Sequence, residues 1–246
     1  EIAFFNDAAI GIAASPKDLL LRAKKLQVTN RVSLKDSMHH LKSSGYIRVK
    51  NNDITAIVDI AEVGASYIPG HAHADSLSME CSLFDQRLIV NSGSSEYGSG
   101  SRRDYERSTS AHSTLEIDGC NSSEVWGGFR VGRRAHVSGL IIRDNNFISA
   151  EHNGYRFLPG SPKHRRSWSI TEKKLLITDC VNGPFNWAKI YYHIHPSIKV
   201  LSADNQQNGS FEFPNGSRAF WKSTAEMTFI QENLFSLEFG KKLPIK

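Results

Sequence analysis

Short runs of alternating apolar and polar residues fill the chain from Tyr46 onward, and turn-forming residues separate them. Successive side chains of a strand point to opposite faces, so this alternation is typical of strands with one buried face. Turn sequences such as DNN, TEKK, NQQNG and PNG recur at roughly the 8- to 12-residue spacing of all-β folds. The pattern predicts an all-β fold, a large antiparallel β-sandwich over residues 46–246, with strands at YIRVK, ITAIVDI, LSMECSL, RLIVN, STLEID, AHVSGLIIR, FISAEHN, RSWSIT, KLLITDCV, KIYYHIH, FEFP, RAFWK, AEMTFI and LFSLEFG.

The first 45 residues follow a helical pattern instead. Ser15 is a candidate N-cap, Pro16 suits the first helical position, and Asp18 falls in the first turn, which predicts a helix over residues 16–27. The stretch LKDSMHHLKSS before Gly45 predicts a second short helix. We therefore expect a helical segment over residues 1–45, a boundary near residues 43–50, and the sandwich after it.

Composition narrows the class of protein. The chain has 246 residues, of which 39% are hydrophobic and 22% charged, and none of its apolar runs approaches the roughly 18 residues of a membrane span. The net charge of +5 suits nucleic acid, an anionic membrane or an acidic polysaccharide. Because neither an RNP motif nor a zinc finger accompanies the basic residues, we expect no nucleic-acid partner.

Three cysteines, Cys81, Cys120 and Cys180, lie far apart in the sequence. An odd number at wide spacing indicates neither a disulfide framework nor a cysteine-based zinc site. The three are predicted to be buried free thiols.

The stretch GHAHADSLSMECSL, residues 70–83, carries the first candidate chemistry. In an extended strand His71, His73 and Asp75 would share one face with the apolar residues that follow at alternate positions. Imidazoles and carboxylates are usual zinc ligands, and His112 could join them from a distance. Isolated histidines are, however, more often hydrogen-bonded polar groups than metal ligands, so both interpretations stay open.

Two further stretches could contact a substrate. SRRDYERSTSAHS, residues 101–113, gathers arginines, a tyrosine and a histidine, which could bind carboxylates or sulfates and exchange protons. The alternative is a solvated loop with local ion pairs. NSSEVWGGFRVGRRAH, residues 121–136, offers Trp126 and Phe129 as a platform for a sugar ring, although packing over the edge of the sandwich is the favoured interpretation.

Together these stretches resemble the heparinase II/III-like family of polysaccharide lyases. The family pattern runs GHxHxDxLSFEL, then RxLVDPGTYxYG, then RDYFRSTxAHNTVxVDGxxQSExWGxFRxGRRA, and it fits residues 65–136 closely. FFNDAA near the start and ENLFSLEFG near the end also fit. The resemblance implies an N-terminal α/α toroid followed by a C-terminal antiparallel β-sandwich. This chain would hold the sandwich, preceded by a remnant of the toroid.

The resemblance also implies an activity and a site. The family cleaves uronate-containing anionic polysaccharides by β-elimination, which requires neutralising the uronate carboxylate, removing the C5 proton and protonating the leaving oxygen. We expect His71 and Tyr105 to be catalytic, with Arg103, Arg107 and Trp126 binding substrate. The implied partners are an acidic polysaccharide and the toroid domain of the same protein, in a bacterial periplasm or cell envelope.

A zinc ion is implied at His73 and His112, with a carboxylate that the family carries at position 91. Here that residue is Asn91. An uncharged amide is a weaker ligand, so zinc is expected to bind weakly or not at all. The same change favours an alternative function, a non-catalytic carbohydrate-binding or scaffolding domain in polysaccharide assembly.

Overall fold

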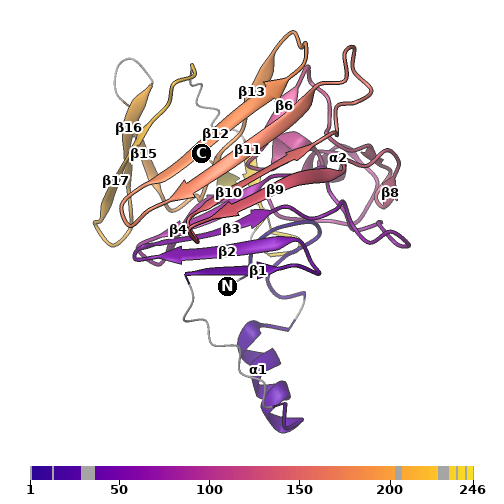
Figure 1. Ribbon diagram of the computed structural model, residues 1–246. Coiled ribbons are helices and arrows are strands. Elements are labelled where there is room, and N and C mark those ends of the chain that lie inside the picture. Colours follow the sequence, from indigo (N-terminus) through magenta and orange to yellow (C-terminus); the bar gives the residue numbers. More distant parts are fainter. Residues whose placement is uncertain are drawn as a thin grey trace.

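The computed structural model describes residues 2–12, 14–28, 37–202, 207–226, 233–236, 238–241 and 243–245. Two antiparallel sheets pack against each other to form the main body (Figure 1). The larger sheet has the strand order β1 (Met38–Leu41), β2 (Tyr46–Asn51), β3 (Ile54–Asp59), β4 (Met79–Leu83), β5 (Gln86–Val90) and β14 (His193–Ile194). The smaller sheet has the order β12 (Leu175–Asn182), β11 (Lys163–Ile170), β10 (Phe147–His152) and β9 (Val137–Arg143).

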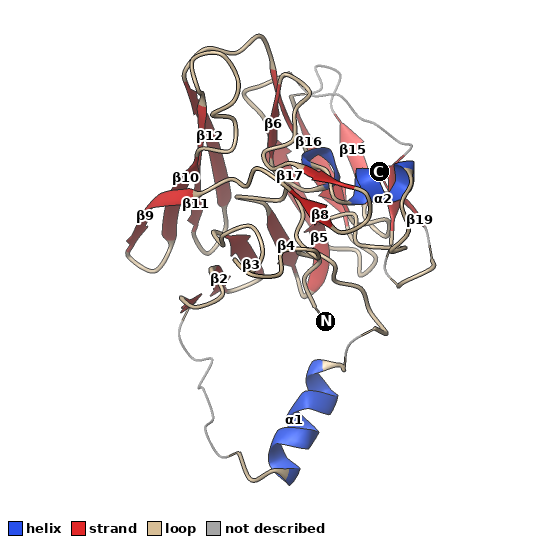
Figure 2. Cartoon of the chain, turned by 90° about the vertical axis from the view of Figure 1, so that its right-hand side faces the viewer, coloured by secondary structure: helices blue, strands red, loops and turns tan. Residues whose placement is uncertain are grey.

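Smaller elements surround this body (Figures 1 and 2). A three-stranded sheet consists of β15 (Lys199–Ser202), β16 (Asn208–Glu212) and β17 (Arg218–Lys222). Paired short strands are β6 (Leu115–Ile117) with β13 (Ala188–Ile190), β7 (Val125–Trp126) with β8 (Arg130–Val131), and β18 (Asn233–Phe235) with β19 (Leu243–Ile245). The described helices are α1 (Pro16–Lys25), α2 (Ser101–Glu106) and the 3₁₀ turn η1 (Thr109–Ala111).

Alternation along the strands builds the core between the two sheets. Ile47 and Val49 of β2 are fully buried, whereas the neighbouring Lys50 is exposed. On the facing sheet, Trp168 and Ile170 of β11 are fully buried and belong to the same core. Burying one such aliphatic or aromatic side chain contributes about 1.5–3 kcal/mol. The predicted all-β fold is therefore confirmed.

Most predicted strands are present, with shifted ends. The DNN turn between β9 and β10 places Asp144 and Asn145 at φ 49° and 51°, the left-handed conformation that a tight hairpin needs. The LSMECSL strand begins only at Met79, and KIYYHIH divides into β13 and β14. The AEMTFI strand falls partly on residues 227–230, which lie outside the described residues.

The prediction of a second helix before Gly45 is wrong. Residues 38–41 of that stretch form the edge strand β1, with Met38 opposite Val49 and Leu41 opposite Tyr46. Strand β1 pairs along its whole length with β2, and the pairing with a neighbouring strand decides its conformation. Propensity is a weak guide when tertiary contacts compete with it.

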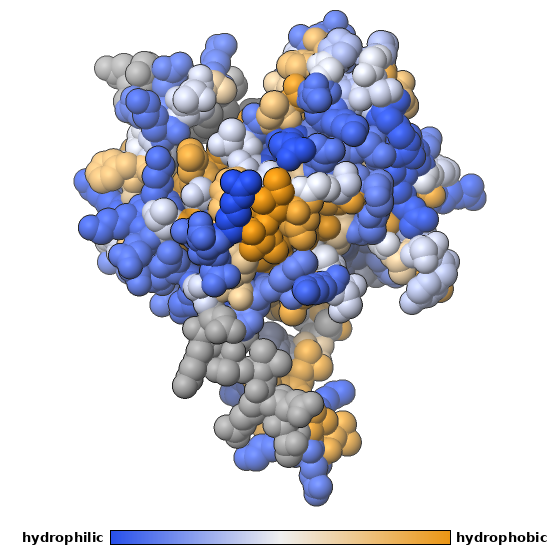
Figure 3. Space-filling model, viewed as in Figure 1, coloured by the Kyte–Doolittle hydropathy of each residue, from blue (hydrophilic) through white to orange (hydrophobic). Residues whose placement is uncertain are grey.

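Helix α1 projects away from the sheets (Figures 1 and 2). Ser15 caps it as predicted, because its Oγ accepts a hydrogen bond from the Asp18 amide at 3.2 Å, and the helix ends at Lys25 rather than residue 27. None of its residues is buried, and Leu19, Leu20 and Leu21 are exposed. The surface of the helix therefore shows hydrophobic side chains beside hydrophilic ones (Figure 3). In the described part of the chain, the helices are too short or too polar to span a membrane.

The cysteine prediction holds only in part. All three thiols are free, and Cys81 is buried, but Cys120 is half-buried and Cys180 is exposed on the outer face of β12. Burial raises the pKa of Cys81 to about 12, so its thiol stays protonated and unreactive.

A buried arginine connects the smaller sheet to two loops that shape the candidate site. Arg166 of β11 donates to both oxygens of Asp179 on β12, with Nε 2.7 Å from Oδ1. Its Nη1 donates to the carbonyl of Leu77 at 3.0 Å and to that of Ser113 at 2.7 Å. The loop before β4 and the loop after η1 are therefore held from inside the sandwich.

Candidate functional site

The N-terminal segment brings a carboxylate into the interior of the sandwich. The Phe4 amide donates to Glu80 Oε1 at 2.9 Å, and the Asn6 amide donates to Asp75 Oδ2 at 3.1 Å. Both acceptors are buried, so these backbone hydrogen bonds fix the path of the segment. Asp7 follows directly and has only 2% of its side chain exposed.

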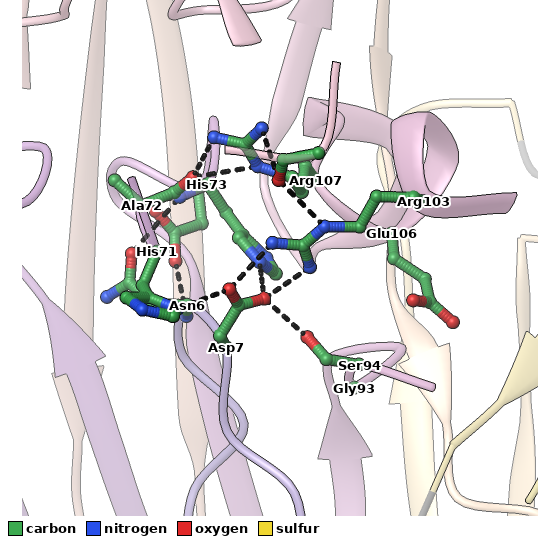
Figure 4. A network of polar contacts seen from close by, with 12 residues as sticks. Asn6, Asp7, His71, Ala72, His73, Gly93, Ser94, Arg103, Glu106 and Arg107 are labelled. Carbon is green, nitrogen blue, oxygen red and sulfur yellow. Dashed lines mark hydrogen bonds and ion pairs between the residues drawn. The ribbon is translucent and has the colours of Figure 1, made fainter. Parts of the chain in front are cut away.

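Asp7 is the centre of a polar network (Figure 4). Its Oδ1 accepts hydrogen bonds from His73 Nε2 at 2.9 Å and from Ser94 Oγ at 3.0 Å. Its Oδ2 lies 2.9 Å from His71 Nδ1. The Arg103 guanidinium donates to both oxygens, with Nη2 2.6 Å from Oδ2. One carboxylate thus joins the N-terminal segment, the loop before β4, the loop after β5, and α2.

The charge on Asp7 is stabilised by these partners. Burial by itself would raise the pKa of Asp7, but hydrogen bonds and charge interactions with His73 and Arg103 hold it well below its usual value. Asp7 is consequently an anion over the whole physiological pH range.

His73 also contacts a second buried imidazole. Its Nδ1 lies 3.1 Å from His112 Nε2, and His112 Nδ1 donates to the Ser108 carbonyl at 2.7 Å. Both rings are buried. Burial, together with the neighbouring His73, lowers the pKa of His112 well below its usual value.

His71 faces outward from the network, and 62% of its side chain is exposed. Its ring is bordered by Tyr97 at 5.7 Å and Phe129 at 5.4 Å between centroids, and Phe239 packs on Tyr97 at 4.9 Å. Gly128 has φ +76°, and its carbonyl accepts hydrogen bonds from buried arginines while Phe129 reaches His71. The left-handed backbone that glycine permits therefore builds this aromatic surface.

Comparison with protein families identifies the fold. A family model described as heparinase II/III-like, C-terminal, matches residues 34–246.

The chain belongs to this family.

Solved structures of heparinases share the fold of this family member. A heparinase III gene product superposes with a TM-score of 0.77 at 20% sequence identity, and the match covers 99% of this chain and 40% of that one. The heparan sulfate lyase HepC from Pedobacter heparinus superposes with a TM-score of 0.74 at 15% identity, again over 99% and 40% of the two chains. The chain thus spans about 40% of the length of these structures. The curated proteins contain no match.

The expected proximity of His73 and His112 is confirmed, but the expected cause, alternation along one strand, is wrong. His73 and His112 are in contact, and His71 turns outward. Residues 70–78 form a loop rather than a strand, with Leu77 at φ 58°. Loop geometry, not alternation along one strand, separates the exposed His71 from the buried His73.

The side chains do not fit the zinc site that the family resemblance implies. Zinc–nitrogen bonds of 2.0–2.1 Å in a tetrahedral shell place ligand nitrogens about 3.3 Å apart, close to the spacing of His73 and His112. A third ligand is the difficulty. Asn91 Oδ1 accepts the Ser113 amide at 2.9 Å, and the side-chain nitrogen, Nδ2, is buried with no hydrogen-bond partner among the described residues. Within the described residues, no group of three His, Cys, Asp or Glu side chains could hold a metal ion.

The predicted substrate-binding arginines lie inside the protein. Arg103 donates to Asp7 and to the Gly128 carbonyl, and the Arg107 donors go to the carbonyls of Ala72, Trp126, Gly128 and Arg130. Both side chains are fully buried. Neither guanidinium is exposed to a substrate carboxylate in this structure, so the binding role of these two arginines stays a prediction.

Tyr105 and Trp126 lie apart from the His71 ring contacts. In the described part of the chain the buried Tyr105 hydroxyl has no hydrogen-bond partner, and burial raises the pKa of Tyr105 to about 12. Tyr97 is the tyrosine that contacts His71. Trp126 is partly exposed on β7, whereas Phe129 from the same stretch borders His71. The catalytic role of Tyr105 and the binding role of Trp126 stay predictions.

Sequence reasoning missed Asp7 and Ser94, and it preferred Tyr105 to Tyr97 for the proton-transfer role. FFNDAA matches the family pattern, but nothing local in it connects Asp7 to a histidine 64 residues away. Only the folded path of the N-terminal segment makes that contact.

Proposed function

We propose that this chain is the β-sandwich part of a polysaccharide lyase that cleaves heparan sulfate or a closely related uronate-containing polysaccharide by β-elimination. The observation that carries the proposal is His71, an exposed imidazole hydrogen-bonded to a buried carboxylate and bordered by aromatic rings. Family membership and the names of the structural relatives support the choice of reaction and substrate class.

The chemistry assigned to His71 is removal of the uronate C5 proton. The C5–H bond breaks as the proton moves to Nε2, the electron pair forms the C4=C5 double bond, and the bond from C4 to the leaving oxygen breaks. The leaving oxygen takes a proton from solvent or from an acid elsewhere in the complete protein. Phe129 and Phe239, both partly exposed, offer apolar rings on which a sugar can stack.

The test is turnover by the protein in its full natural length. Incubation with heparan sulfate should produce the ultraviolet absorbance of an unsaturated uronate, whereas neutral dextran should give none. His71→Gln should lose this activity while remaining folded. Equal activity of the variant and the wild type would overturn the role of His71, and absence of product from every acidic polysaccharide would overturn the lyase.

A second candidate function is binding of an acidic polysaccharide without cleavage. The amide of Asn91, where the family carries a carboxylate, is the observation that favours it. Calorimetric binding of heparan sulfate together with no unsaturated product would select this function.

A further inference from the structure

We infer that Asp7 is a positioning residue that fixes one tautomer of His71, with the proton on Nδ1 and the lone pair of Nε2 directed toward substrate. The inference deepens the proposed lyase function and rests on it for the role of Nε2. It stands on the contacts of the carboxylate, each of which leaves a single assignment of protons.

Asp7 itself cannot act as the donor in its contact with His71. Its two oxygens are surrounded by donors, namely the Arg103 guanidinium, the Ser94 hydroxyl and His73 Nε2. A carboxylate in such surroundings is ionised and accepts hydrogen bonds only. The contact of 2.9 Å between Asp7 Oδ2 and His71 Nδ1 therefore requires a proton on Nδ1.

A neutral imidazole carries one ring proton, so a proton on Nδ1 leaves Nε2 as an acceptor. His71 is largely exposed, whereas Asp7 is almost fully buried, so the hydrogen bond anchors the ring at its inner edge. Edge contacts with the Tyr97 and Phe129 rings limit rotation of the His71 ring. Orientation and tautomer are thus set by the same contact, as in sites where a buried carboxylate holds a catalytic base.

Asp7 aligns His71 without taking the proton itself. Arg103 pairs with both carboxylate oxygens and is fully buried, so the negative charge of Asp7 is matched inside the protein. Asn6 fixes the neighbouring backbone, because its Oδ1 accepts the His73 amide at 3.1 Å and its Nδ2 donates to Tyr46 Oη at 3.1 Å. The carboxylate is therefore rigid on both sides.

The direct test reads the tautomer of wild-type His71 in ¹⁵N-labelled protein. Two-bond ¹H–¹⁵N correlations of the imidazole rings distinguish a proton on Nδ1 from one on Nε2, and the signal that disappears in His71→Gln is the one to read. At a pH where the ring is neutral, we expect the Nδ1–H tautomer. Observation of the Nε2–H tautomer would overturn the inference, whether or not the protein is active.

Asp7→Asn supplies the second test, with turnover of heparan sulfate as an added measurement. An amide places an NH₂ group against His71 or Arg103, and facing His71 it favours the Nε2–H tautomer. We expect the tautomer to invert and turnover to fall by about 10³- to 10⁴-fold, the scale of a wrong-tautomer histidine. Asp104→Asn, an exposed carboxylate change on α2, is the matched control and should alter neither measurement.

The outcomes separate cleanly. A folded Asp7→Asn protein with an unchanged tautomer, or with wild-type turnover, would overturn the inference. If this variant does not fold, the wild-type spectrum alone decides. Absence of turnover in the wild type would count against the proposed lyase only, because the tautomer is read without substrate.

Discussion

Two buried networks in this sandwich use the same set of four side chains, namely one carboxylate, one arginine and two histidines. The Asp7 network consists of Asp7, Arg103, His73 and His112, and the Asp179 network consists of Asp179, Arg166, His164 and His152. In each, the arginine donates to both carboxylate oxygens and the two imidazoles approach to 3.1 Å. Their remaining contacts differ, and the difference separates a structural network from a candidate catalytic one.

In the Asp179 network every imidazole nitrogen has a hydrogen-bond partner while both rings are neutral. The Gly154 amide donates to His152 Nδ1 at 3.0 Å, so the proton of His152 is on Nε2 and is donated to His164 Nδ1. His164 in turn donates from Nε2 to Asp179 Oδ1 at 2.6 Å. Burial lowers the pKa of both histidines, consistent with neutral rings.

The hydrogen bonds of the Asp7 network cannot all form with two neutral imidazoles. His112 donates from Nδ1 to the Ser108 carbonyl, so a neutral His112 must accept at Nε2. His73 then donates from both nitrogens, to His112 and to Asp7. The network also extends through Asp7 to the exposed His71. One network is complete within the protein, whereas the other holds an additional proton and ends at the surface.

The largest expected effect is on stability, from breaking the closed network. Asp179→Asn leaves a fully buried arginine and a buried histidine without their anion, and removal of one partner of a buried ion pair costs about 3–5 kcal/mol. We expect the free energy of unfolding in urea to fall by that amount. Glu151→Gln, which breaks a pair with the exposed Arg165, is the control and should cost less than about 1 kcal/mol. Similar losses in both variants would contradict the structural role of the Asp179 network.

The second effect is a pH dependence of stability at His193, which lies between the networks. The His193 amide donates to Ser113 Oγ, and its Nε2 lies 2.9 Å from the Ser110 carbonyl. Burial lowers the pKa of His193 from 6.5 to about 4. Between these values the unfolded chain binds more protons than the folded one, so stability falls as the pH drops through this window.

Comparison with His193→Gln isolates this contribution, because the amide can still donate to the Ser110 carbonyl. Relative to the variant, the wild type should lose roughly 3 kcal/mol between pH 6.5 and about 4. Denaturant unfolding at several pH values measures the difference. Parallel pH curves for the two proteins would show that His193 is not held neutral by the fold.

Local features of the fold could be predicted from the sequence, whereas features that depend on tertiary contacts could not. Alternation is local, so β2, β3, β10 and β11 could be predicted from their own residues, as could the Ser15 cap of α1. Strand β1 could not, because a neighbouring strand decides its conformation. Likewise, an arginine reads as a basic surface residue in sequence, and only the fold shows that Arg103 and Arg107 are buried among acceptors.

The third expected effect contrasts the exposed and the buried histidine. His71→Gln should change the free energy of unfolding by no more than about 0.5 kcal/mol, since the ring is largely exposed. His164→Gln should cost about 1–3 kcal/mol, because it leaves polar partners unsatisfied inside the sandwich. Thermal and urea unfolding of both variants would check the ranking. A larger loss for His71→Gln would mean that the Asp7 network is chiefly structural.

The smallest expected effect concerns metal binding to the open network. A carboxylate at position 91 could accept the Ser113 amide with one oxygen and still present a second oxygen where Asn91 has its unpartnered Nδ2. Zinc between His73 and His112 would replace the proton that His73 now donates, and the added negative charge would help to compensate the metal. Asn91→Asp should therefore raise zinc affinity by about tenfold or more.

Elemental analysis and competitive zinc titration would measure the change, with Asn182→Asp, an exposed addition of the same charge on β12, as the control. One equivalent of tightly held zinc in the wild type would show that two imidazoles suffice and that the argument from ligand charge is wrong. Equal zinc content in the two variants would show that the second oxygen does not reach the pair. Binding confined to Asn91→Asp would mean that one amide decides whether a proton or a metal ion joins the two histidines, a choice that the Asp179 network, already closed by the Gly154 amide, does not offer.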